Sequence, residues 1–355
     1  MTRGSQKYYL RPNGLLESRY AVPLLKKKQV VKINDAYFNS IEVIKKTKTS
    51  IVKKNLSVSE FIVESKNNEN LQRLFDSLQM LSNNYSNNLF KKKNFLIFGI
   101  LNITPDSFSD GGDYFNLEKS IKRAKKMVEE GADFIDIGGE STRPGAAQVD
   151  VNDEILRVMP VIQRISNSKI PISLDTRNSS TMEFGLSSGV SIINDVSGLK
   201  HDLKSVKVIS KFKKPIIIMH MPGNPKNMMK KNKYRDVVLD VYDFLENRVK
   251  FCEEHGIKKS NIILDPGIGF GKDFEQNLSI LKNLSIFHAI GCPIMIGISR
   301  KRFISNISKE EPPKKRLGGS ISASLAALNQ GVNIHRVHDV SDIVQSIKVF
   351  QQIIN

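Results

Sequence analysis

Tryptophan is absent from the 355 residues of this chain, and only two cysteines are present. Cys252 and Cys292 lie 40 positions apart, with neither a CxxC motif nor a histidine at ligand spacing. This pattern argues against a disulfide framework and against a zinc site. We expect both cysteines to be buried as small apolar side chains.

Long hydrophobic runs are also missing. No apolar stretch approaches the roughly 18 residues that a membrane-spanning helix needs, so we expect no membrane partner. The first ten residues carry Arg and Lys but no apolar segment followed by a small-residue cleavage site, which argues against a secretory signal. We therefore expect the protein to stay in the cytoplasm.

Acidic residues are the scarcer charge, with 36 Asp and Glu against 54 Lys and Arg, and a net charge of +18. Residues 1–93 alone hold +11 of this excess. Their clusters Lys26–Lys28 and Lys91–Lys93 have no interleaved aromatic residues, and the chain shows no RRM, KH or helix-turn-helix signature. We expect no nucleic-acid partner, because charge alone is a weak signal for one.

From residue 94 onward, short apolar runs alternate with longer amphipathic segments, as in repeated βαβ units. The runs are almost continuously apolar, which is typical of strands buried on both faces. Eight predicted strands cover Phe95–Asn102, Asp133–Gly138, Ile170–Asp175, Ser191–Asp195, Pro215–His220, Asn261–Asp265, Pro293–Ser299 and Asn333–His338.

Eight such units match a (β/α)₈ TIM barrel better than an open doubly wound sheet, which usually has fewer strands. We predict a barrel domain at residues 94–355 and a basic N-terminal extension at residues 1–93, either small α/β or partly disordered. A chain beginning near Asn94 is expected to fold and catalyse, unless the extension covers a barrel face or a dimer contact. Polar residues gather at the carboxyl ends of the predicted strands, where barrel enzymes build their active sites.

Six motifs at these strand ends resemble those of the dihydropteroate synthase family, in the order in which the family has them. The resemblance spans residues 95–342. The motifs are Asn102–Gly112, Gly138–Gly145, Asn194–Gly198, Asp265–Lys272, Ser299–Lys301 and Arg336–Val340.

The resemblance implies an enzyme, a transferase that condenses 6-hydroxymethyl-7,8-dihydropterin diphosphate with para-aminobenzoate. Pyrophosphate leaves, and dihydropteroate forms for folate biosynthesis. It also implies a homodimer and a Mg²⁺ cofactor. Two alternatives remain open at this point: a methyltetrahydrofolate methyltransferase, and a non-catalytic paralogue that binds pterin.

A pterin ring presents a flat edge of donors and acceptors, so its pocket needs a carboxylate together with amide or ammonium donors. Asp175 could also stabilise positive charge at the bridging carbon of the substrate. By resemblance, the pterin-binding residues are Asp175, Asn194, Met219, Asp265, Gly297 and Lys301.

The diphosphate end of the substrate needs cationic donors and a divalent ion. Arg336 and His338 are separated by one residue of the last strand, so their side chains point the same way. The resemblance assigns Asn102, Thr142, Arg336 and His338 to the diphosphate, Asn102 to Mg²⁺, and catalysis to Asp175, Asn102, Arg336 and His338.

The aminobenzoate site is implied at two loops and at the start of a helix. The resemblance assigns it Phe108, Thr142, Arg143, Pro144, Phe270, Lys301 and Arg302. Phe270 has a competing interpretation as a core residue, because Phe is usually buried for packing alone. Arg302 departs from the family, in which many members have Ser; its guanidinium could pair with the substrate carboxylate or point into solvent.

Overall fold

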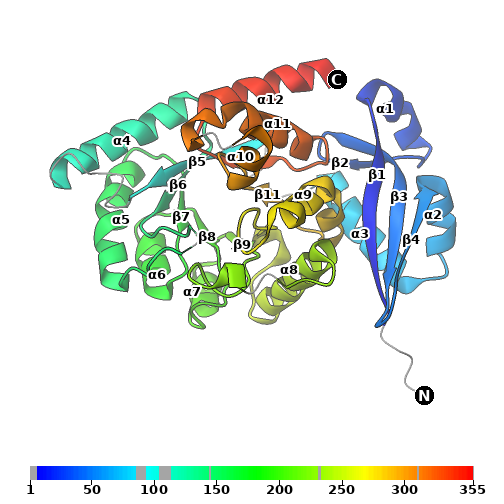
Figure 1. Cartoon of the computed structure of the whole chain (residues 1–355), viewed down its shortest axis with the longest axis horizontal. Helices are drawn as coiled ribbons and strands as arrows, with labels where there is room; N and C mark the ends of the chain where they lie inside the picture. Colours follow the sequence, from blue (N-terminus) through cyan, green and yellow to red (C-terminus); the bar gives the residue numbers. More distant parts are fainter. Residues whose placement is uncertain are drawn as a thin grey trace.

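The computed structural model describes residues 6–84, 93–103, 113–143, 145–230, 233–309 and 312–354. Within them, a barrel of eight parallel strands is surrounded by helices, and an antiparallel sheet stands at one side of the barrel (Figure 1). The predicted TIM barrel is confirmed.

All eight predicted barrel strands are present, in the order β10-β9-β8-β7-β6-β5-β12-β11. Between the two ends of this order, the only ladder contact among the described residues is a bridge that pairs Leu264 with Ile294. The barrel therefore has one weak seam, between β10 and β11. The strands are β5 (Leu96–Asn102), β6 (Phe134–Gly138), β7 (Ile172–Asp175), β8 (Ile192–Asp195), β9 (Ile216–Met219), β10 (Ile262–Asp265), β11 (Met295–Ile296) and β12 (Ile334–Val337).

The barrel interior is closed by apolar side chains. Eight buried residues from seven strands form a cluster of their own, in which the rings of Phe98 and Phe134 stack with centroids 4.7 Å apart. Alternate residues of the same strands face the surrounding helices and are buried as well. Burial on both faces explains why the strands are continuous apolar runs.

The helices around the barrel begin near the carboxyl ends of the strands. Asp236 caps α8 by accepting the backbone N–H groups of Val238 and Leu239, and Asp273 opens α9 with a capping box. Cys252 and Cys292 are both buried, as expected. The helices are α4 (Asp113–Glu129), α5 (Val151–Ser166), α6 (Ser179–Ser187), α7 (Ser205–Phe212), α8 (Val237–Glu254), α9 (Phe274–Lys282), α10 (Arg302–Ser308), α11 (Leu317–Leu328) and α12 (Val340–Ile354), with 3-10 turns η3 (Met228–Lys230), η4 (Lys259–Asn261), η5 (Leu284–Ile290) and η6 (Pro313–Lys315).

The N-terminal extension forms a small α/β unit. The long strand β3 pairs with β1 on one side and with β2 and β4 on the other, all antiparallel. Helix α3 lies between this sheet and the barrel (Figure 1). The elements are β1 (Lys7–Leu16), α1 (Ser18–Lys26), β2 (Val31–Ile33), β3 (Ala36–Lys46), β4 (Ile51–Ser57), α2 (Val58–Ser65) and α3 (Glu69–Asn84).

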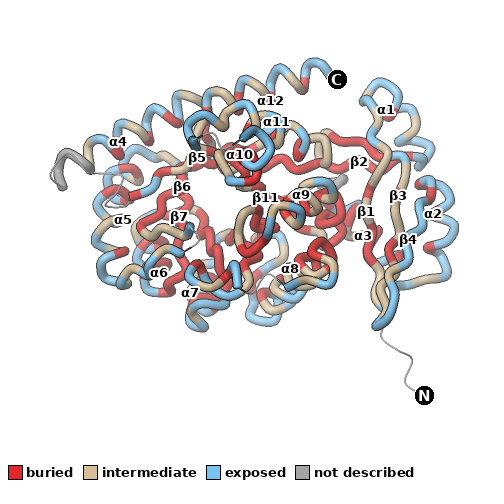
Figure 2. Tube along the Cα trace, in the orientation of Figure 1, coloured by how far each residue is buried: buried red, intermediate tan, exposed pale blue. Residues whose placement is uncertain are grey.

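This extension covers one side of the barrel. Both β1 and α3 pack on η5, and the buried side chains of the two parts join in one apolar cluster. Figure 2 shows buried residues in β1, in α3 and in the adjoining part of the barrel. Tyr9 is fully buried, its ring meeting Tyr242 of α8 edge-on at 5.0 Å, and its hydroxyl donates to Asp243 at 2.9 Å. Whether residues 94–355 fold without the extension stays a prediction, as does the domain boundary itself.

Among the described residues, no helix is both long enough and apolar enough to cross a membrane.

The buried contact of Tyr9 gives a stability prediction. Tyr9→Ala should lower the free energy of unfolding by about 3–5 kcal/mol, the usual range for truncating a large buried aromatic residue. Tyr9→Phe keeps the ring and should cost only about 1–2 kcal/mol for the lost hydroxyl bond. Urea denaturation of both variants measures the two costs. Equal stability of Tyr9→Ala and the parent would show that this contact does not hold the extension to the barrel.

Candidate active site at the barrel rim

A layer of charged side chains lies directly above the apolar cluster that fills the barrel. Arg336 of β12 donates from Nε to Asp136 of β6 at 2.6 Å and from Nη2 to Asp175 of β7 at 2.8 Å. All three residues project inward from strands, and both carboxylates are less than a tenth exposed. One guanidinium is therefore shared by two buried carboxylates.

This shared guanidinium sets the ionisation of the layer. Burial raises the pKa of Asp175; the charge of Arg336 opposes this shift, and the charge of Asp136 adds to it. Burial alone would lower the pKa of Arg336, but Asp136 and Asp175 outweigh burial and raise it. Arg336 thus stays charged. Asp175, with its raised pKa, is protonated more readily than an ordinary aspartate.

Asn194 and Asp265 extend this layer around the barrel. Asn194 donates from Nδ2 to Asp136 at 3.3 Å and is 3% exposed. Asp265 accepts the backbone N–H of Gly267 at 2.7 Å through Oδ1. Burial raises the pKa of Asp265, while the Gly267 N–H, Lys301 and Arg336 act in the opposite direction.

Two glycines border this layer. A Cβ added at Gly297 would lie 3.8 Å from Asp265 Oδ2 and 3.9 Å from Arg336 Cδ, with nothing nearer. A Cβ added at Gly138 would lie 3.5 Å from Asp175 Cβ. Because neither position carries a side chain, a ligand can approach the backbone closely there. We call the region between Gly138 and Gly297, beside Asp175 and Asp265, the slot.

The wall of the slot combines apolar and cationic groups. Met219, buried at the end of β9, clusters with Met221 and Met228, and the half-buried ring of Phe270 packs against them. Lys301 places Nζ 4.1 Å from the centroid of the Phe270 ring. Burial, helped by the charge of Arg336, lowers the pKa of Lys301 to about 8. Phe270 thus contacts the core cluster on one side and Lys301 on the other, so both interpretations of this residue have support.

Three of the four residues expected at the diphosphate, Asn102, Thr142 and His338, lie at or after the carboxyl ends of their strands. Asn102 is exposed at the end of β5, and Thr142 is half-buried in the loop after β6. The His338 ring hydrogen-bonds through Nδ1 to Ser299 Oγ at 3.1 Å. Burial, with Arg336 and Arg300 nearby, lowers the pKa of His338 to about 3, so this imidazole is neutral at pH 7. The guanidinium of Arg336 lies deeper, with the carboxylates expected at the pterin.

The aminobenzoate residues are only partly described. Arg143 and Arg302 are exposed, and Arg302 is the first residue of α10. Phe108 and Pro144 lie outside the described residues. Over the part of the chain that the structure describes, no group of three or more His, Cys, Asp or Glu side chains is placed to hold a metal ion. Asn102 remains the single predicted Mg²⁺ ligand.

Two further charged groups at the site were missed from the sequence. Asp136 is one, although an acid within the apolar run Phe134–Gly138 was a usable signal. The other is Arg177, which forms a buried ion pair with Glu140 of the motif Gly138–Gly145, with Nη2 to Oε1 at 2.8 Å and both side chains 5% exposed. This pair fastens the loop after β6 to the loop after β7.

Comparisons with known proteins agree with this geometry. The family described as "Pterin binding enzyme" matches residues 98–338. Dihydropteroate synthase of Bacillus subtilis is 42% identical over 285 residues, which cover 80% of this chain and 97% of that protein. The Escherichia coli K12 enzyme is 41% identical, covering 72% of this chain and 90% of its own length.

Solved structures of dihydropteroate synthases also match this chain. Dihydropteroate synthase of Clostridium difficile, solved in the presence of pteroic acid, superposes with a TM-score of 0.69 at 43% identity and covers 73% of this chain and 96% of its own. The Xanthomonas albilineans enzyme, in complex with 7,8-dihydropteroate, has a TM-score of 0.66 at 37% identity over 73% and 93% of the two chains. With its eight-stranded barrel and its charged layer at the rim, the chain belongs to the dihydropteroate synthase family of pterin-binding enzymes.

Proposed function

We propose that this protein joins 6-hydroxymethyl-7,8-dihydropterin diphosphate to para-aminobenzoate, the reaction that gives the family its name. The observation that carries the proposal is the slot between Gly138 and Gly297, with Asp265, Asn194 and Lys301 around it. The relatives named above are dihydropteroate synthases, which favours this reaction over methyl transfer.

We assign the pterin edge to side chains that still have unused hydrogen-bond donors or acceptors. Asp265 uses Oδ1 for the Gly267 N–H, while Oδ2 faces the slot above Gly297. We assign Oδ2 to the amino-pyrimidine N–H groups of the pterin, and Asn194 and Lys301 to its ring nitrogens and carbonyl. Met219 covers one face of the ring.

Bond exchange at the bridging carbon follows from the charges around it. The C–O bond to the diphosphate breaks, the amino nitrogen of para-aminobenzoate forms the new C–N bond, and that nitrogen loses a proton. Ionised Asp175 stabilises positive charge at the carbon as the diphosphate departs. Arg336 holds Asp175 in place and favours its ionised form.

The leaving diphosphate lies at the rim near Asn102, Thr142 and His338. A neutral His338 can donate one hydrogen bond, and a nearby diphosphate would favour its protonated form. Asn102 suits Mg²⁺, because this ion commonly takes one or two protein oxygens and completes its shell with substrate phosphates and water. When bound, Mg²⁺ would offset the charge of the diphosphate.

The acceptor enters over Phe270 and Lys301. We assign its ring to Phe270 and its carboxylate to the exposed guanidinium of Arg302, with Thr142 and Arg143 beside it. Phe108 and Pro144 stay predictions from the resemblance, as do the homodimer and the cytoplasmic location.

The reaction itself is tested by pyrophosphate release. Purified protein with the pterin diphosphate and Mg²⁺ should release pyrophosphate only when para-aminobenzoate is present, with dihydropteroate formed in equal amount. Release that is independent of para-aminobenzoate, or no release at all, would contradict the proposed function.

Asp265→Asn should weaken binding of a pterin analogue by about 30- to 1000-fold, a loss of about 2–4 kcal/mol, because one of the two accepting oxygens becomes an NH2 group that must face either the Gly267 N–H or the pterin N–H groups. Isothermal titration calorimetry measures the change. Glu254→Gln, an exposed substitution at the far end of α8, is the matched control and should leave affinity unchanged. An affinity within about threefold of the parent would remove Asp265 from the pterin site.

The lowered pKa of Lys301 predicts that pterin binding depends on pH. Its pKa near 8 lies below the ordinary lysine value, so the free protein loses this proton as the pH rises through about 8. Because the protonated amine is a stronger donor to the pterin than the neutral amine, affinity should fall from about pH 7 to about pH 9.5. Lys301→Met should bind weakly and lack this dependence. A flat affinity profile for the parent would show that Lys301 is not the donor.

Asp136 should act through Asp175. Asp136→Asn removes a negative charge beside Asp175, which lowers the pKa of Asp175 and shifts the acid limb of kcat/KM to lower pH, by about one unit. The pH profiles of the variant and the parent test this shift. An acid limb that stays in place would mean that Asp175 does not govern it.

A further inference from the structure

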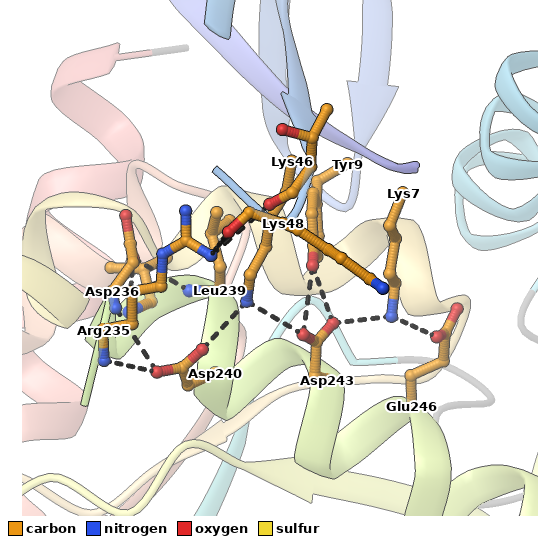
Figure 3. Close-up of polar contacts among 12 residues, drawn as sticks. Lys7, Tyr9, Lys46, Lys48, Arg235, Asp236, Leu239, Asp240, Asp243 and Glu246 are labelled. Atoms are coloured by element: carbon orange, nitrogen blue, oxygen red, sulfur yellow. Dashed lines mark hydrogen bonds and ion pairs between the residues drawn. The ribbon is translucent and has the colours of Figure 1, made fainter. Parts of the chain in front are cut away.

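The N-terminal extension reaches the end of a loop that borders the active site. This β9–α8 loop, residues 220–236, connects strand β9 to helix α8. Lys46, the last residue of β3, places Nζ 2.9 Å from Asp240 Oδ1 of α8 (Figure 3). The other oxygen of Asp240 accepts the backbone N–H groups of Arg235 at 2.9 Å and Asp236 at 3.3 Å. One carboxylate therefore links the extension to the end of the β9–α8 loop.

A second contact lies beside the first. Arg235 donates from Nη1 to the backbone carbonyls of Lys48 at 2.8 Å and Thr47 at 3.4 Å, in the turn between β3 and β4 (Figure 3). The extension thus contacts both the side chain of Arg235 and, through Asp240, its backbone.

The ion pair of Lys46 is sheltered enough to matter. Its side chain is 16% exposed and that of Asp240 is 27% exposed. Burial alone would lower the pKa of Lys46, but Asp240 and Asp243 outweigh burial and raise it, so the amine is charged at pH 7. A sheltered pair of fixed geometry contributes more than an exposed one.

The described residues of the β9–α8 loop, 220–230 and 233–236, meet the active site at several points. Met221 and Met228 pack with Met219 and Phe270 in the wall of the slot. Pro225 accepts the backbone N–H of Gly145 at 3.0 Å, which joins the β9–α8 loop to the loop after β6. Tyr234 donates its hydroxyl to the carbonyl of Gly271 at 2.9 Å, next to Phe270.

We propose that the extension is a positioning element for the pterin pocket, with Lys46 and Arg235 holding the β9–α8 loop in the shape that walls the slot. The inference rests on the proposed function, because it names pterin as the ligand whose binding the extension supports. The structures compared above cover 73% of this chain. The contacts of Lys46 and of the β3–β4 turn with the β9–α8 loop come from the extension, which lies outside the barrel.

Docking of the extension does not depend on Lys46 alone. Lys7 contacts Asp243 and Glu246 at 2.6 Å each, and Tyr9 contacts Asp243, both on later turns of α8 (Figure 3). Lys46 also contacts Asp243 Oδ2 at 3.3 Å, so its replacement removes one docking contact together with the link to Asp240. The contacts of Lys7 and Tyr9 remain and should keep the extension docked while the link to the loop is lost.

The experiment compares Lys46→Met with Lys54→Met in the full chain. Lys54 also lies in the extension's sheet, but it pairs with Glu64 of the extension itself. Lys46→Met should raise the KM for the pterin diphosphate by about three- to tenfold, as expected for a lost sheltered ion pair, and Lys46→Arg should restore it. Lys54→Met should stay within about 1.5-fold of the parent.

Hydrogen exchange gives a direct readout of the loop. Peptides from residues 220–230 should exchange faster in Lys46→Met than in Lys54→Met, while peptides from the Tyr9 contact keep their protection. Arg235→Ala removes an exposed side chain and serves as a second variant, with the same expected rise in KM.

An unchanged KM together with unchanged exchange of residues 220–230 in Lys46→Met and Arg235→Ala would overturn the proposal, even if thermal stability fell. A parent protein without turnover would instead contradict the proposed function. The affinity for a pterin analogue, measured by calorimetry, would then decide the inference by the same ratio between Lys46→Met and Lys54→Met.

Discussion

The sharing of Arg336 between Asp136 and Asp175 is the interaction on which the active site depends. Two carboxylates so close together and so little exposed would repel each other strongly and would be costly to desolvate. A fixed guanidinium offsets both costs through two directed hydrogen bonds. It also holds Asp175 in place and shares Oδ2 of Asp136 with Asn194, which donates to the same oxygen.

The charges at the rim come close to balance. Asp136, Asp175 and Asp265 face three cations: Arg336, Lys301 and Lys272. Lys272 donates to the carbonyls of Gly267 and Phe270 at 2.8 and 2.9 Å, and burial lowers its pKa to about 7. A nearly neutral layer can be buried on an apolar floor, whereas an excess of either sign would draw in water or protons.

The barrel could be predicted because burial on both faces leaves a strong local signal. Its eight apolar runs and the polar residues after them are visible in the sequence without any tertiary information. The extension carried weaker or conflicting signals. Pro12 and Gly14 argue against a strand, yet β1 contains both, because it pairs only with β3 in the sheet. Ser57 and Glu60 form a capping box for α2, a helix-start signal that is visible in the sequence.

The pairings between distant segments could not be predicted at all. Lys46 and Asp240 are separated by 194 positions, and no periodicity relates them. Tyr9 looks like an ordinary strand residue until Tyr242 and Asp243 are placed against it. The same limit applies to Arg336, whose sequence position suggested the diphosphate and whose guanidinium lies with the carboxylates below it.

The seam between β10 and β11 has a mechanical consequence. A closed barrel deforms most easily where two neighbouring strands share the fewest hydrogen bonds. At this seam, Asp265 is the last residue of β10, and Gly297 directly follows β11. Thermal motion should therefore separate Asp265 from Gly297 at less cost than it would distort the rest of the rim. The connection across the seam includes η5, on which β1 and α3 of the extension rest. The extension therefore packs on the segment that connects β10 to β11, the two strands that are most weakly joined in the barrel.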